Sequence, residues 1–189
     1  MTKEDSVRNR LVRAGLQELN QYGVQNFSVR RVATACDVSC AAPYKHFKDK
    51  ESYIAAIIQY GKEMWAERQL RVLERLPNSR RAQLVEISLE YVRFLVENPY
   101  FRSIIMLTNA EFDDESLRLR GRISETTQTI VKEYCAEVGM SKSAAKFKLY
   151  VVISLIYGAA LMFDNGGLEY NEENMDLVAH GIKREFELP

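Results

Sequence analysis

Apolar residues recur along this chain at the spacing of helices, and no stretch alternates between apolar and polar in the manner of a half-buried strand. Gly and Pro are scattered and number only 9 and 4 among 189 residues, which favours long helices over many short strands. The pattern predicts an all-α protein of about nine helices. The expected segments run approximately over Lys3–Tyr22, Ser28–Ala35, Ser39–Phe47, Asp49–Leu76, Arg80–Glu97, Tyr100–Thr108, Glu111–Val138, Ser141–Phe163 and Glu172–Phe186.

Residues that begin or end helices stand at several of these boundaries. Thr2, with Asp5 three residues later, is expected to cap the first helix, and Gly23 to end it. Pro77-Asn78-Ser79 stops the long helix and starts the next one. Gly139 ends a later helix and Ser141 begins its successor, so the division of the body into separate helices has a local chemical basis.

The stretch from Phe27 to Ser52 holds two short helices joined by a tight turn. In the first, Val29, Val32 and Ala33 fall at i, i+3 and i+4 and form one apolar face, while Ser28 caps the start. Cys36-Asp37-Val38 forms the turn, and Ser39 is expected to cap the second helix. This is the layout of a helix-turn-helix, whose second helix enters the major groove of DNA. Pro43 removes one backbone donor, so this second helix must be short or irregular.

The residue types in this stretch suit contact with DNA. Ala41 and Ala42 leave the second helix thin enough for its backbone to approach base edges, and the longer side chains after them offer hydrogen-bond donors to phosphates. The expected DNA contacts, which include phosphate anchors before and after the second helix, are Ser28, Arg30, Ser39, Ala41, Ala42, Tyr44, Lys45, His46 and Lys50.

The run Tyr22-Gly23, Phe27-Ser28-Val29, Val32-Ala33, Val38-Ser39, Tyr44-Lys45-His46-Phe47 and Asp49-Lys50-Glu51 resembles the DNA-binding domain of the TetR/AcrR family of bacterial transcriptional regulators. The pattern departs from the family in three places. Cys36-Asp37 replaces the common Ala-Gly, Pro43 replaces a larger apolar residue, and Ser52-Tyr53 stands where Leu often follows the Glu. Asp37 must therefore tolerate a conformation that Gly adopts freely.

The resemblance implies a helix-turn-helix domain over residues 1–48, joined by the long helix to a ligand-binding and dimerisation domain over 49–189. It implies a ligand cavity in this second domain, where aromatic and Met side chains gather; the candidates are Trp65, Tyr91, Phe94, Phe101, Met106, Phe112 and Tyr157. Each of these is equally compatible with ordinary core packing. The last two helices are expected to form the interface of a homodimer through Leu155, Gly158, Met162, Met175, Val178 and Ile182.

Charge and composition narrow the possible function classes. The formal net charge is zero, but residues 1–60 hold 9 Lys and Arg against 6 Asp and Glu, a mildly basic balance that fits nucleic-acid contact. The polar start predicts no signal peptide, and the longest apolar run, residues 149–163, is shorter than a membrane span requires. An odd number of cysteines, 3, predicts no disulfide framework and a cytoplasmic setting.

Motifs for catalysis, metal binding or phosphate cradling are missing from the sequence, so no enzyme, cofactor or metal is expected. Cys36 and Cys40 flank the turn and could form a thiol switch, although a free Cys more often behaves as a small hydrophobe. The sequence favours a ligand-responsive regulator, a repressor released from a palindromic operator by a small molecule. An activator has the same sequence features. The alternative class is a helical small-molecule-binding protein or enzyme in which the helix-turn-helix serves packing alone.

Overall fold

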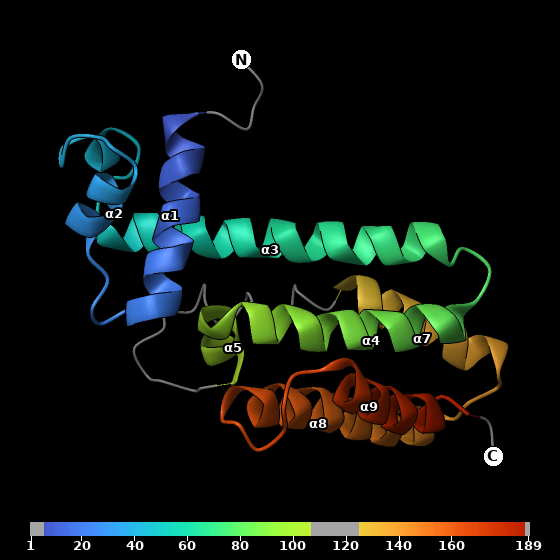
Figure 1. The fold of residues 1–189 in the computed structure, drawn as a ribbon. Helices are drawn as coiled ribbons and strands as arrows, with labels where there is room; N and C mark the ends of the chain where they lie inside the picture. The colour runs from blue at the N-terminus through green and yellow to red at the C-terminus, as the bar shows by residue number, and fades with distance from the viewer. Residues whose placement is uncertain (1–5, 107–124, 188–189) are drawn as a thin grey trace. The chain divides into compact units, whose positions relative to one another are not determined.

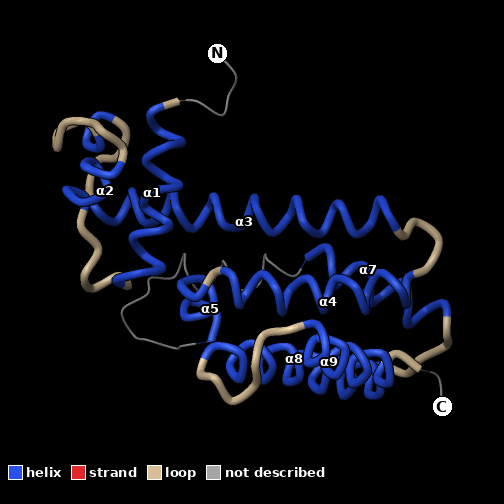
Figure 2. The backbone as a smooth tube through the Cα atoms, in the orientation of Figure 1, coloured by secondary structure: helices blue, strands red, loops and turns tan. Residues whose placement is uncertain are grey.

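A computed structural model describes residues 6–106 and 125–187, and the side chains of 6–102 and 125–187. All regular structure in these ranges is helical (Figures 1 and 2), so the all-α prediction is confirmed. The elements are α1 (Val7–Tyr22), α2 (Val29–Ala35), the 3-10 helix η2 (Pro43–Lys45), α3 (Lys50–Arg75), α4 (Arg80–Glu97), α5 (Pro99–Met106), α7 (Glu125–Glu137), α8 (Lys142–Asp164) and α9 (Glu172–Glu185).

Most predicted helix ends are confirmed by hydrogen bonds at the caps. The Ser79 hydroxyl accepts a hydrogen bond from the backbone N–H of Ala82 at the start of α4, and the Ser141 hydroxyl accepts one from Ala144 N–H at the start of α8. Gly23 follows α1 with φ of 71°, a conformation that glycine adopts without strain. Because each cap is a local interaction, the sequence around it is sufficient to predict it.

The predicted start of the first helix is wrong. Helix α1 begins at Val7, and its cap is Ser6, whose hydroxyl accepts a hydrogen bond from Asn9 N–H at 3.2 Å; Thr2 lies outside the described residues. Within α1 itself, the buried residues begin at Leu11, and the first turn is held by the Ser6 cap.

The second helix of the helix-turn-helix is not the α-helix expected from Ser39 to Phe47. It consists of a turn followed by η2, and Ala42 N–H donates to the Ser39 carbonyl at 2.9 Å. The i to i+3 pattern continues where His46 N–H donates to the Pro43 carbonyl. Pro43 lacks an N–H and cannot donate to the carbonyl four residues earlier, which gives the physical reason for the tighter winding.

The described chain divides into two compact units, residues 1–64 and 65–189, and the division falls within α3. The functional domain limits expected from the resemblance, 1–48 and 49–189, stay a prediction. Unit 1 is built around α1, α2 and the first part of α3. Unit 2 is built around α4, which packs against α5, α7, α8 and α9 (Figure 1). The helix expected over Glu111–Val138 is seen as α7 from Glu125 onward, and residues 107–124 lie outside the described ranges.

The core of unit 1 depends on close contact between α1 and α3. Tyr53 is fully buried, stacks on Phe47 with ring centres 4.1 Å apart, and donates its hydroxyl to the Leu11 carbonyl at 2.6 Å. A Cβ added at Gly15 would lie 2.7 Å from Ile57 Cδ1 and 3.2 Å from the Tyr53 hydroxyl. Any side chain at this position would therefore have to displace buried groups of α3.

Helix α8 is apolar over most of its circumference. Within the described ranges it is the one helix long and apolar enough, by length and composition, to cross a membrane, and only 28% of its most apolar window is buried inside the chain. One face packs on α4 and α9. The rest of its apolar surface, including Phe147 and Tyr150, is left uncovered within one protomer.

The turn between α2 and η2 gives the first testable prediction. Asp37 has φ of 54°, in the left-handed region that costs most L-residues about 1–2 kcal/mol. Asp37→Val should therefore lower the free energy of unfolding by about 1–2 kcal/mol, whereas Asp37→Gly should cause no such loss. Urea denaturation followed by circular dichroism measures both. Equal stability of the two variants would contradict the assigned turn geometry.

Candidate nucleic-acid interface and ligand cavity

The start of α2 is fixed by a carboxylate from α1. Glu18 is only 8% exposed, and its Oε1 accepts hydrogen bonds from Ser28 N–H at 3.0 Å and from Arg31 Nε–H at 2.8 Å. Ser28 itself accepts from Arg31 N–H through its hydroxyl, as the sequence predicts for a cap. Negative charge at a helix N-terminus is favourable, so Glu18 joins α1 to α2 and positions the helix-turn-helix.

The Arg31 side chain also contacts Glu18, Asn26 and Tyr22. It donates a second hydrogen bond to Glu18 and one to the Asn26 carbonyl, and its guanidinium lies 4.2 Å from the centre of the Tyr22 ring. The hydrogen bond with Glu18 raises the pKa of Arg31. Arg31 therefore serves the structure of unit 1, while Arg30 beside it is exposed and available for other contacts.

Three of the expected DNA contacts, Tyr44, Lys45 and His46, lie between two buried residues. Pro43 and Phe47 are both buried, so the side chains around them are directed outward. Arg30, Ser39, Ala41, Tyr44, Lys45 and His46 are exposed, and Ser28, Ala42 and Lys50 are half-buried. Exposed donors on a convex turn of this kind are able to reach phosphates and base edges. That they contact DNA stays a prediction.

The N-terminus of α3, next to the expected phosphate contact Lys50, is capped by Asp49. Asp49 caps the helix by accepting from Ser52 N–H at 2.8 Å, and Ser52 Oγ accepts in return from Asp49 N–H at 3.0 Å. These bonds with Ser52 lower the pKa of Asp49. Because the Asp49 carboxylate already occupies the helix N-terminus, a phosphate contact at Lys50 depends on the ammonium group of its side chain.

Arg8 is a candidate that the sequence analysis missed. It is exposed on α1, and its guanidinium lies 5.5 Å from the centre of the Phe47 ring, directly after the segment that ends at His46. Arg8 lies far from Phe47 in sequence, so spacing along the chain does not indicate this proximity.

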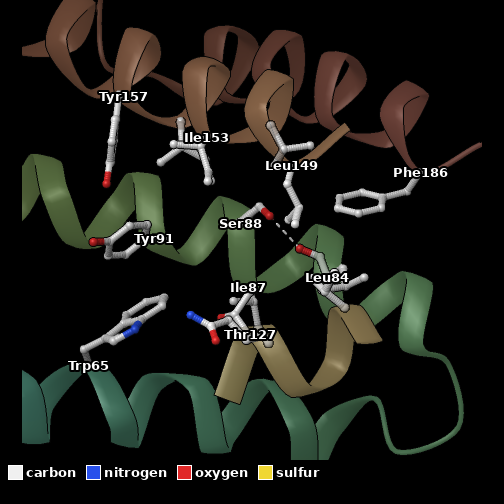
Figure 3. A pocket seen from close by; sticks show the side chains of 14 residues that line it. Trp65, Leu84, Ile87, Ser88, Tyr91, Thr127, Leu149, Ile153, Tyr157 and Phe186 are labelled. Atoms are coloured by element: carbon white, nitrogen blue, oxygen red, sulfur yellow. Dashed lines mark hydrogen bonds between the residues drawn. The ribbon is translucent and has the colours of Figure 1, made fainter. Parts of the chain in front are cut away.

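Unit 2 contains a cavity of about 500 Å³ between α3, α4, α7 and α8 (Figure 3). Trp65 approaches it from α3, and Leu149, Ile153 and Tyr157 approach it from α8 (Figure 3). The residues that line it are Trp65, Leu84, Ile87, Ser88, Tyr91, Thr127, Gln128, Val131, Leu149, Val152, Ile153, Ile156, Tyr157 and Phe186. A cavity of this volume with mostly apolar walls is typical of small-molecule sites.

Three residues expected at a ligand pocket, Trp65, Tyr91 and Tyr157, line this cavity. Phe94 and Phe101 are instead buried behind it and stack on each other with ring centres 5.9 Å apart. Phe112 and the side chain of Met106 lie outside the described residues. The aliphatic walls from α7 and α8 were missed because isolated Val, Leu and Ile residues at helical spacing do not distinguish a cavity from a filled core.

Several polar groups at the cavity are already hydrogen-bonded. The Ser88 hydroxyl donates to the Leu84 carbonyl at 2.7 Å (dashed in Figure 3), and Gln69 Nε2 donates to Thr127 Oγ1 at 3.0 Å. Burial, followed by the nearby Tyr157 hydroxyl, raises the pKa of Tyr91, so this phenol stays uncharged. The Phe186 carbonyl accepts from the Tyr134 hydroxyl at 2.8 Å, which holds the C-terminal end of the wall in place.

The residues expected at a dimer interface differ in exposure. Gly158 and Met162 are exposed on α8; Leu155, Met175 and Val178 are half-buried. Ile182 is fully buried within the protomer, so its side chain contributes to the core between α8 and α9. The exposed apolar residues that the sequence analysis missed are Phe147, Tyr150, Ile153, Leu161 and Leu177, all between 46% and 69% exposed.

Comparison with known proteins supports the assignment of a helix-turn-helix to unit 1. Residues 11–57 match the family described as bacterial regulatory proteins, tetR family. No curated protein sequence matches the chain. A TetR family transcription regulator from Marinobacter aquaeolei VT8 has a similar structure, with a TM-score of 0.76, 20% identity, and coverage of 97% of this chain and 96% of that one.

Two other solved structures of the same fold contain ligands. The transcriptional regulator FadR from Bacillus subtilis, in complex with stearoyl-CoA, has a TM-score of 0.69 at 14% identity, covering 94% of this chain and 96% of that one. A single-substitution variant of TetR from Acinetobacter baumannii AYE, in complex with minocycline, has a TM-score of 0.59 at 22% identity, covering 96% and 94%. At these identities the likeness shows the fold.

The fold and the exposed segment of unit 1 define a helix-turn-helix DNA-binding protein with a second, helical domain. Residues 11–57 match the model of the tetR family of bacterial regulatory proteins, so this part of the chain is similar to the DNA-binding domain of that family.

The exposed basic residues give a prediction for DNA binding. Lys45→Ala and Lys50→Ala should each weaken binding to all DNA sequences about equally, because a phosphate contact carries no sequence information. Each should also reduce the slope of log affinity against log salt concentration by about 1. Lys132→Ala, on the exposed surface of α7 in unit 2, is the matched control. Unchanged affinity in both unit 1 variants would show that these lysines are not anchors.

Proposed function

We propose that the protein is a homodimeric repressor that binds a palindromic operator and releases it when a small molecule occupies the cavity of unit 2. The observation that carries this proposal is the continuity of α3. One helix supplies Tyr53 to the core of unit 1 and Trp65 to the wall of the cavity. A ligand that displaces Trp65 therefore acts on the same rigid element that supports the helix-turn-helix.

The mechanism is a shift between two populations. Without ligand, the two helix-turn-helix units of a dimer are held at a separation that matches successive major grooves. A ligand that binds more tightly to a different tilt of α3 favours that tilt and lowers the population able to bind DNA. The strength of release depends on this difference in affinity between the two states, and equal affinity for both would give none.

The exposed apolar surface of α8 supports the homodimer. Burial of apolar surface is favourable at about 25 cal/mol per Å², and two-fold dimers bury the same patch from both subunits. Ser154 and Gly158 are both exposed and lie one helical turn apart, which provides a low surface for a second helix. The same α8 packs on α4 and α9 within its own chain, so we propose a partner subunit, and not a membrane, as its cover.

The protein is proposed to act in the cytoplasm, on double-stranded DNA, without a cofactor and without enzymatic activity of its own. The competing proposal is a helical small-molecule-binding protein or enzyme whose helix-turn-helix serves packing alone. The two differ in DNA affinity and in its dependence on salt, because neutralising phosphates releases counterions and packing does not.

The first experiment titrates the purified protein against DNA from its own upstream region at several salt concentrations. We expect tight binding by a dimer, steeply weakened by salt and well above binding to random DNA. If the upstream fragment behaves as random DNA does, a selection from random sequences tests for an operator elsewhere. Failure to select any sequence would contradict the regulator proposal and favour the packing alternative.

The dimer has its own test at Gly158. A Cβ added there meets no atom within 4 Å in the protomer, and a non-glycine residue favours helix by about 1 kcal/mol. Gly158→Glu should therefore leave the protomer folded but convert the dimer to monomer in sedimentation and weaken operator binding. Ala136→Glu, on exposed α7, is the control and should remain dimeric. A dimeric Gly158→Glu protein would place the interface elsewhere.

A further inference from the structure

The described walls of the cavity in unit 2 consist of uncharged residues. Among the 14 residues of the described chain that line it, none carries a formal charge at neutral pH. Eleven are aliphatic or aromatic, and the other three are a Ser, a Thr and a Gln. The only ionisable lining groups are the two phenols, and Tyr91 stays protonated because its environment is buried.

The least exposed arginines described in unit 2 are already paired. Arg68 is 18% exposed and forms ion pairs with Glu90, at 3.1 Å, and with Glu97. Arg102 is 8% exposed, lies 2.6 Å from Asp164, and donates to the Leu95 carbonyl. A ligand carboxylate or phosphate that recruited either arginine would first have to compete with an existing ion pair.

The polar capacity of the walls is also small. The Ser88 hydroxyl hydrogen is donated to the backbone, and the Thr127 oxygen is occupied by Gln69. The Tyr91 and Tyr157 hydroxyls lie together at one end of the cavity (Figure 3), where they interact with each other. A ligand with one hydroxyl or carbonyl group can be satisfied there, whereas a charged group would lose its hydration and find no counter-charge among the described lining residues.

We propose that this cavity binds uncharged, mainly hydrocarbon or aromatic molecules with at most one or two neutral polar groups, and selects against carboxylates and ammonium ions of the same size. The inference rests on the proposed function insofar as it treats the cavity as the effector site. The preference arises from desolvation. Burial of the apolar part stabilises each bound ligand by a similar amount, and only the charged ligand also loses the hydration of its charge without a compensating ion pair.

The chain contains its own reporter for this cavity. Trp65 is the single tryptophan among 189 residues, it lines the cavity, and it is 3% exposed. Its fluorescence therefore reports occupancy without a label. The test titrates 1-decanol, decanoate and decylammonium, below their micelle-forming concentrations at neutral pH, and follows Trp65 emission for each.

We expect 1-decanol to bind roughly tenfold or more tightly than either charged analogue, a ratio that corresponds to about 1.4 kcal/mol. Each ligand contains ten carbons. Because one carbon of decanoate is its carboxyl carbon, its alkyl part is one methylene shorter, a difference of about 0.8 kcal/mol, and charge is the main variable. Binding of decanoate or decylammonium as tight as that of decanol would overturn the proposal. So would unchanged Trp65 emission with decanol up to its solubility limit.

A variant with an added charge allows each ligand to be compared between two proteins, so that differences in solubility between ligands cancel. Ile153 lines the cavity and is 46% exposed, so Ile153→Lys adds an ammonium group to the wall; sedimentation checks that the variant keeps the oligomeric state of the wild type. This variant should gain affinity for decanoate and lose affinity for decylammonium. Leu70→Lys, on a 55% exposed position of α3 away from the cavity, is the matched control and should keep the wild-type order. Equal decanoate binding by wild type and Ile153→Lys would contradict the argument from charge.

Failure of this inference can be distinguished from failure of the proposed function. The Trp65 titration contains no DNA, so it tests the cavity alone. Operator binding measured with and without decanol tests coupling. If decanol binds but leaves operator affinity unchanged, the ligand class stands and the effector role of the cavity fails. If a charged ligand binds best and also releases DNA, the effector role stands and the neutral class fails.

Discussion

The structure depends on the requirement that α3 pack in two cores at once. A 26-residue helix is about 39 Å long, and its apolar residues must be buried in both units because neither unit is complete without them. Tyr53 and Ile57 are fully buried in unit 1; Trp65 and Val72 are buried in unit 2. A helix interior has few soft degrees of freedom, so a change in packing around Trp65 cannot be absorbed locally as it would be in a loop.

Charge is distributed differently in the two units. In unit 1, the one strongly buried carboxylate among the described residues, Glu18, is used to join helices, and the cations around the helix-turn-helix remain on the surface. In unit 2, two arginines of α3 pair with glutamates of α4: Arg68 with Glu90 and Arg75 with Glu86. The formal net charge of zero is thus the sum of a mildly basic part, residues 1–60 with 9 Lys and Arg against 6 Asp and Glu, and a mildly acidic part, residues 61–189 with 17 against 20.

The sequence predicted features that depend on local interactions and missed those that depend on distant ones. The caps at Ser28, Ser79 and Ser141, and the irregular second helix at Pro43, follow from residues within one turn of each site. The prediction of Thr2 as the first cap was wrong because Ser6, a residue type that caps equally well, caps α1 instead. The cavity walls and the Arg8–Phe47 contact bring together residues from separate helices, which periodicity along one helix does not reveal.

The short η2 segment separates the stability of unit 1 from its choice of DNA sequence. Pro43 and Phe47 hold the segment through burial, and its few backbone bonds run mainly from i to i+3. Ala41, Tyr44, Lys45 and His46 contribute exposed side chains to the surface and little to the core, so substitutions there are nearly free of cost to folding. Under the proposed function, descendants of this protein can therefore diverge rapidly in operator preference while the scaffold stays unchanged, and duplicated copies can acquire separate sets of target genes.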